Sequence, residues 1–82
     1  MKKLSISNNV RKYRFLNDEM TQKELAQKVG VSRQTIVAIE KGHYSPTLEL
    51  CFKISLVFNK PIDDIFKVDA IDGKKVEENE EK

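Results

Sequence analysis

The chain has 82 residues, 39% of them hydrophobic and 34% charged, and its formal net charge is +2. This length provides one domain with a small core, and no apolar run approaches the roughly 20 residues of a membrane-spanning helix. The single cysteine excludes an internal disulfide, and neither it nor the single histidine has a partner at the spacing of metal ligands. We therefore expect a cytoplasmic protein with no membrane segment, no metal and no cofactor.

The charge is unevenly distributed along the chain. Residues 1–68 contain twelve Lys and Arg against seven Asp and Glu, whereas residues 69–82 contain three Lys against six acids. The formal net charge of residues 1–68 is therefore +5, and that of residues 69–82 is −3. A basic body supports binding to a polyanion such as nucleic acid, although a charge of this size is common in soluble domains.

The first predicted elements are a short N-terminal segment and a helix. Leu4 and Ile6 alternate with polar residues, which predicts either a short strand or an unstructured arm. Asn8 or Asn9 can cap a helix that runs to about Leu16. The positions of this helix that we expect to face inward are Val10, Tyr13 and Arg14.

Residues 21–41 predict two short helices joined by a tight turn, and they are the most informative part of the chain. Thr21 and Glu24 have the spacing of a capping box, which marks the start of a helix. Gly30 follows that helix, at the point where the turn requires a residue that tolerates a positive φ. The apolar face of this first motif helix is predicted to consist of Leu25, Ala26 and Val29.

The second motif helix begins after Ser32, which is a favoured N-cap residue. Ile36 and Ile39 are expected to point inward, and Val31 to fill the corner between the two helices. A helical hairpin with no DNA-binding role could share this apolar spacing, but it would not need Arg and Gln at the start of its second helix. The pattern therefore favours a DNA-binding helix-turn-helix, whose outward residues are Arg33, Gln34, Val37 and Ala38.

The remaining elements are predicted from caps and helix breakers. Gly42 and Pro46 belong to a loop, and Thr47 or Ser45 can cap a fourth helix over residues 48–58. Pro61 suits the first turn of a short fifth helix. The expected apolar face of the fourth helix is Leu48, Cys51, Ile54, Ser55 and Phe58, and that of the fifth is Ile62, Ile65 and Phe66.

The segment after the fifth helix divides into two parts. Residues 66–71 alternate apolar and polar side chains, which is compatible with a strand. From Asp72 on there is almost no apolar residue, which predicts disorder. The expected organisation is thus a DNA-binding domain with its dimerisation segment over residues 1–71, followed by an acidic disordered tail over residues 72–82.

The span 9–66, roughly 70% of the chain, resembles the Cro/C1-type helix-turn-helix family, also called the xenobiotic-response-element family. The stretches that carry the resemblance are TQKELA, VGVS, TI, IEKG, SP and the closing IDDIF. The short length and the ending IDDIFKV are most similar to compact bacterial repressors, including small dimeric repressors of the cytolysin-regulator type. The resemblance implies an all-α, compact five-helix, lambda-repressor-like domain, and the terminal segments leave open a short pair of β-strands.

The resemblance also implies roles for individual residues. Gln22 matches the family glutamine that holds a DNA phosphate at the start of the first motif helix. Arg33 and Gln34 match the positions that read bases. Arg14 and Glu40 match a structural ion pair of the lambdoid phage repressors.

The chemistry of the outward residues fits base reading in the major groove. The donor fork of Arg33 matches guanine O6 and N7, and the amide of Gln34 matches adenine N6 and N7. A phosphate contact or a solvated charge is the alternative for Arg33. The residues that could contact a thymine methyl are Thr35, Val37 and Ala38. The candidates for phosphate contacts are Gln22, Ser32, Lys41, His43 and Tyr44, of which the last two could also be an exposed loop pair.

One recognition helix covers few base pairs and the chain has no second motif, so we expect a homodimer on a palindromic operator. The expected function is that of a transcriptional regulator, most simply a repressor, with double-stranded DNA as partner and no small-molecule ligand. The sequence contains no set of a nucleophile and a base, so we do not expect an enzyme.

The alternative is the antitoxin of a toxin–antitoxin pair that also regulates its own operon, with an acidic tail that neutralises a basic toxin. The candidate interface residues are Leu56, Val57, Phe66, Val68 and Ile71, with Leu4 and Ile6 as an additional strand beside residues 66–71.

Overall fold

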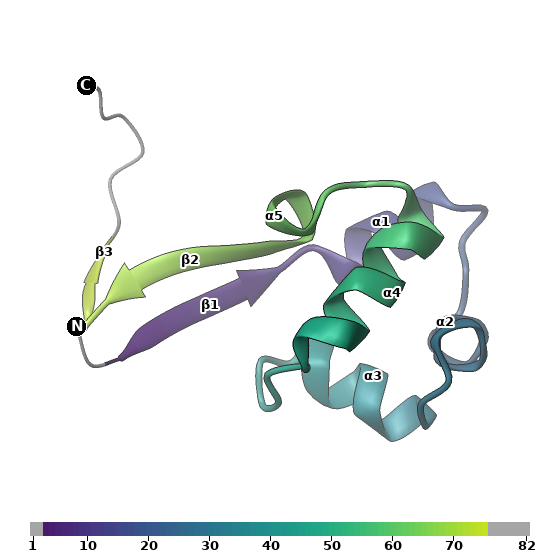
Figure 1. Ribbon diagram of the computed structural model, residues 1–82, viewed down its shortest axis with the longest axis horizontal. Coiled ribbons are helices and arrows are strands. Elements are labelled where there is room, and N and C mark those ends of the chain that lie inside the picture. The colour runs from purple at the N-terminus through teal and green to yellow at the C-terminus, as the bar shows by residue number, and fades with distance from the viewer. Residues whose placement is uncertain (1–2, 76–82) are drawn as a thin grey trace.

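The computed structural model describes residues 3–75 and shows a five-helix body from which a narrow antiparallel sheet projects (Figure 1). The five predicted helices are confirmed. The predicted all-α class is incomplete, because the terminal segments form a three-stranded sheet with strand order β1-β2-β3. The elements are β1 (Leu4–Asn8), α1 (Val10–Leu16), α2 (Gln22–Val29), α3 (Arg33–Glu40), α4 (Leu48–Phe58), α5 (Ile62–Ile65), β2 (Phe66–Ile71) and β3 (Lys74–Lys75).

The predicted caps determine where the helices begin. Thr21 and Glu24 form both halves of the capping box at the start of α2. The hydroxyl of Ser32 accepts a hydrogen bond from the N–H of Thr35 and so caps α3. Thr47 caps α4 in the same way, through the N–H of Leu50. Each cap satisfies an N–H group that the helix itself leaves without a partner.

The core lies between the helices of the body. Its buried residues come from α1 to α5 and include all five apolar residues predicted for the motif helices. The predicted apolar face of α4 is partly wrong, because Leu48 is 68% exposed whereas Leu50 is buried. The buried residues of α4, Leu50, Ile54 and Phe58, follow one another at intervals of four and form one stripe, whereas Leu48 lies two residues before Leu50 and so on another side of the helix. The core residues are Val10, Leu25, Ala26, Val29, Ile36, Ile39, Leu50, Ile54, Phe58 and Ile65.

The sheet pairs segments that are far apart in the sequence. β1 and β2 are antiparallel, with Leu4 opposite Ile71 and Asn8 opposite Phe66. The register shifts between Ser5 and Ile6, which leaves Asp69 of β2 without an opposite residue, as in a β-bulge. The sheet is attached to the body at Asn9, whose N–H donates to the carbonyl of Ile65 at 2.7 Å.

A bulge changes which side chains share a face. Because Asp69 is one extra residue in β2, the side chains after it point to the opposite face from the one that strict alternation would give. Ile71 therefore lies on the same face as Phe66 and Val68. On β1 the opposite partners of these three residues are Leu4, Ile6 and Asn8. One face of the sheet is therefore almost entirely apolar, and the other carries Ser5, Ser7, Lys67 and Ala70.

The predicted tail starts too early. Asp72 and Gly73 both have positive φ, 52° and 82°, which is the backbone of a two-residue type I′ hairpin turn and explains the Asp-Gly sequence. The turn returns the chain along β2, so that Lys74 and Lys75 pair with Ile71 and Ala70. Residues 72–75 thus belong to the sheet, whereas the rest of the predicted tail, residues 76–82, lies outside the described residues. None of the helices within residues 3–75 is long and apolar enough to cross a membrane.

Candidate nucleic-acid interface

Helices α2 and α3 form a helix-turn-helix held together by its apolar residues. Gly30 ends α2 in the left-handed conformation with φ 79°, as the sequence predicts. The N–H groups of Gly30 and Val31 both donate to the carbonyl of Ala26, which closes the turn. Ile36 and Ile39 of α3 are fully or almost fully buried in the same core as the apolar face of α2. This packing leaves the opposite side of α3 uncovered.

The N-terminal end of α3 presents Arg33 and Gln34 as exposed side chains. Within residues 3–75 neither side chain forms a hydrogen bond or an ion pair with the protein, so their donors are available to a ligand. Val37 and Ala38 are half-exposed one turn further along. The hydroxyls of Ser32 and Thr35 hydrogen-bond to each other at 3.0 Å, which engages both of them within the cap of α3.

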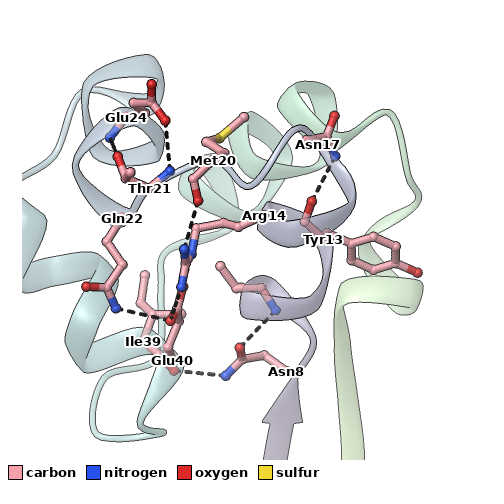
Figure 2. Close-up of polar contacts among 11 residues, drawn as sticks. Asn8, Tyr13, Arg14, Asn17, Met20, Thr21, Gln22, Glu24, Ile39 and Glu40 are labelled. Carbon is pink, nitrogen blue, oxygen red and sulfur yellow. Dashed lines mark hydrogen bonds and ion pairs between the residues drawn. The ribbon is translucent and has the colours of Figure 1, made fainter.

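Arg14 and Glu40 form an ion pair between α1 and the last turn of α3 (Figure 2). The guanidinium donates from Nε to Oε2 at 2.7 Å and from Nη2 to Oε1 at 3.0 Å, which is the two-point geometry that Arg favours. Its Nη1 donates to the carbonyl of Met20 at 2.8 Å. Only 15% of the Arg14 side chain and 10% of the Glu40 side chain are exposed. The pair therefore fastens α1 and the loop before α2 to α3.

Gln22 belongs to the same network, a contact that no local pattern in the sequence predicts. Its Nε2 donates to Oε1 of Glu40 at 3.1 Å (Figure 2). An amide nitrogen carries two hydrogens, so one remains for another acceptor while the bond to Glu40 fixes the orientation of the group. No sequence spacing indicates this contact, because Gln22 and Glu40 are 18 residues apart and the helix-turn-helix packing alone brings them together.

A groove of about 890 Å³ opens over this network, between α1, α2 and α3. Basic side chains outnumber acidic ones in its lining, where Glu19 and Glu40 are the two acids. Arg11 and Lys23 are exposed cations of this groove, although neither was predicted from the sequence to contact DNA. The basic side chains that line it are Arg11, Arg14, Lys23, Arg33 and Lys41. Such a concentration of positive charge favours a polyanion.

The other predicted phosphate contacts lie apart from this groove. His43 and Tyr44 are exposed in the loop after α3, and the N–H of His43 donates to the carbonyl of Ala38. Tyr44 lines a separate small pocket that also involves Cys51. Burial raises the pKa of the Cys51 thiol, which favours its protonated form. Among the described residues no three His, Cys, Asp or Glu side chains gather in a way that could hold a metal ion.

The predicted interface residues occupy three places. Phe66, Val68 and Ile71 share the apolar face of the sheet, and Val68 is exposed. Leu56 is 79% exposed on the outer side of α4. Val57 is half-buried and lies with Leu16 and Met20 near the loop between α1 and α2, away from the strands.

Comparison with known proteins agrees with this geometry. The family model HTH_3, described as helix-turn-helix, matches residues 11–65. An HTH-type transcriptional regulator of Methanocaldococcus jannaschii is 54% identical over 61 residues, which cover 74% of this chain and 91% of that protein. One of Archaeoglobus fulgidus is 60% identical over 50 residues, covering 61% and 70%. The cryptic phage CTXphi transcriptional repressor RstR of Vibrio cholerae is 36% identical over 59 residues, covering 72% and 52%.

Proposed function

The chain belongs to the Cro/C1-type helix-turn-helix family of transcriptional regulators, and we propose that it is a repressor that binds a palindromic operator as a homodimer. The similarity to the phage repressor RstR supports repression as the mode of regulation. The observation that carries the proposal is the pair of unengaged side chains at the start of α3, Arg33 and Gln34, next to a groove lined by cations.

Base reading is assigned to the N-terminal half of α3. An α-helix fits the major groove, and the first residues of a recognition helix reach the base edges. Arg33 can donate twice to a guanine, and Gln34 can donate to and accept from an adenine. The partly exposed Val37 and Ala38 then contact thymine methyl groups. The exposed Arg11, Lys23 and Lys41 lie around the same groove and face the phosphates.

Homodimerisation is assigned to the apolar face of the sheet. Leu4, Ile6 and Val68 on this face are between 42% and 48% exposed, although they are large apolar side chains. A sheet this narrow has little independent stability in water unless its apolar face is covered. If a two-fold axis passes through the interface, the apolar face of one copy covers the same apolar face of the other copy. The same two-fold axis makes the preferred DNA site a palindrome.

The proposal is tested by selecting bound sequences from random DNA with the purified protein and measuring its mass in solution by sedimentation. We expect a palindromic consensus with half-sites about one turn of DNA apart, and a dimer at micromolar concentration. The matched control is the double variant Arg33→Ala/Gln34→Ala, which should fold but select no consensus. A monomer that selects an asymmetric short site would contradict the homodimer, and selection of the same consensus by the double variant would contradict the assignment of the reading residues.

A further inference from the structure

Asn8 joins the sheet to the recognition helix. It is the last residue of β1, and its Nδ2 donates to the carbonyl of Ile39 in the last turn of α3 at 2.9 Å (Figure 2). Its Oδ1 accepts from the N–H of Val10, the first residue of α1, at 3.1 Å. The Nδ2 donor binds α3 and the Oδ1 acceptor binds α1, and these two hydrogen bonds together hold the side chain in a single orientation.

Asn8 lines two hollows. The first is a pocket of about 140 Å³, whose lining includes Ile6, Ile39, Cys51 and Phe66. The second is the groove over the network of Arg14, Gln22 and Glu40. Close packing normally fixes the angle between two elements. Phe66 packs against the core and the N–H of Asn9 donates to the carbonyl of Ile65, so the sheet is attached on its α5 side. Toward α3, the bond from Asn8 to Ile39 is the one side-chain hydrogen bond that the described strand residues make, so it limits the angle on that side.

We propose that Asn8 is a positioning residue that sets the angle between the sheet and α3, and thereby the distance between the two recognition helices of the dimer. The inference rests on the proposed homodimer and adds the element that fixes its geometry. α3 has eight residues and is thus about 12 Å long, so a change of angle at Ile39 displaces Arg33 at the other end of the helix. Half-sites one DNA turn apart tolerate little displacement. Asn8 therefore determines which half-site spacing the dimer accepts.

The fold itself should survive the loss of this bond. The carbonyl of Ile39 also accepts from the N–H of Gly42 at 3.0 Å, so it keeps one partner when Asn8 is replaced. Asn8→Ser retains an oxygen that can accept from the N–H of Val10, but it is too short to reach Ile39. Asn9→Ala is the matched control, because the neighbouring Asn9 donates from Nδ2 to the carbonyl of Asp64 at 3.0 Å and forms no hydrogen bond to α3 within residues 3–75.

The experiment measures binding of wild type, Asn8→Ala, Asn8→Ser and Asn9→Ala to the selected operator, to operators one or two base pairs shorter or longer, to one half-site and to random DNA. Wild type and Asn9→Ala should prefer one spacing sharply. The Asn8 variants should remain dimers in sedimentation, lose about two- to tenfold more affinity on the selected operator than on half-site and random DNA, and show a flattened spacing profile.

Two results would overturn the inference alone. The Asn8 variants could keep the sharp spacing profile, or they could lose affinity equally on every DNA, which would mark a general loss of structure. A wild-type protein that is monomeric, or indifferent to spacing, would instead refute the homodimer proposal and the role of Asn8 with it. Sedimentation of the wild type separates these cases.

Discussion

Replacing Arg14 by methionine should destabilise the protein by about 3 kcal/mol. Arg14 donates three hydrogen bonds of 2.7, 3.0 and 2.8 Å, two of them to the carboxylate of Glu40. The variant leaves that carboxylate largely buried, with the Nε2 of Gln22 as its remaining side-chain partner among the described residues. Removing one member of a buried ion pair costs roughly 3–5 kcal/mol, and the residual exposure of 15% and 10% places this pair at the lower end of that range.

Thermal unfolding followed by circular dichroism, at one fixed protein concentration, provides the assay. A loss of about 3 kcal/mol corresponds to a fall in Tm of roughly 12–24 °C for a domain of this size. Lys53→Met is the matched control, because it removes the Lys53–Glu49 pair, which is 3.2 Å long with side chains 49% and 79% exposed. We expect that control to cost at most about 0.5 kcal/mol.

The double variant Arg14→Met/Glu40→Leu tests whether the stranded carboxylate of Glu40 causes the loss of stability. If the stranded charge of Glu40 produces the loss, removing that charge should restore much of the stability. Arg14→Met melting within a few degrees of Lys53→Met would refute the reasoning, because the ion pair would then behave as a solvated one. A double variant no more stable than Arg14→Met would refute the assignment to the stranded carboxylate.

Three further predictions concern DNA binding and assembly. Arg33→Ala and Gln34→Ala should each cost about 1–3 kcal/mol on the selected operator and little on random DNA; equal losses in a titration with both DNAs would make them phosphate contacts. Gln22→Ala should weaken binding to operator and random DNA alike, because it removes a phosphate donor at the start of α2, and unchanged affinity for both would exclude that role. Val68→Lys, on the apolar face of the sheet, should give a folded monomer in sedimentation, whereas Ser5→Lys on the polar face should leave the dimer intact; the reverse pattern would place the interface elsewhere.

Much of the fold follows from local sequence signals. The capping box at Thr21 and Glu24, the N-cap at Ser32 and the positive φ of Gly30 are each determined by residues within one helical turn. The apolar spacing of the motif helices identified the buried side of both α2 and α3 correctly. These signals suffice to place Arg33 and Gln34 on the exposed side of α3.

The features that the sequence did not predict depend on contacts between distant segments. The bulge at Asp69 is a property of the pairing of β1 with β2, and it decides that Ile71 shares a face with Phe66. The hydrogen bond of Gln22 to Glu40 requires two helices to be packed first. The buried side of α4 was ambiguous in the sequence because the helix has two apolar rows, and only the packing of the body decides that Leu50, Ile54 and Phe58 are buried while Leu48, Phe52 and Leu56 are exposed.

The pairing of β1 with β2 also has a consequence for the order of events during synthesis. The hydrogen bond between Ser7 and Asp69 spans 62 residues, whereas the helix-turn-helix closes over a short stretch of chain. Local contacts form early in folding and distant ones late. We expect α2 and α3 to pack together while residues 4–8 are still without their strand partner, because residues 66–71 are synthesised later. The surface assigned to the second copy is therefore assembled last, which delays association of nascent chains until each DNA-reading unit is formed.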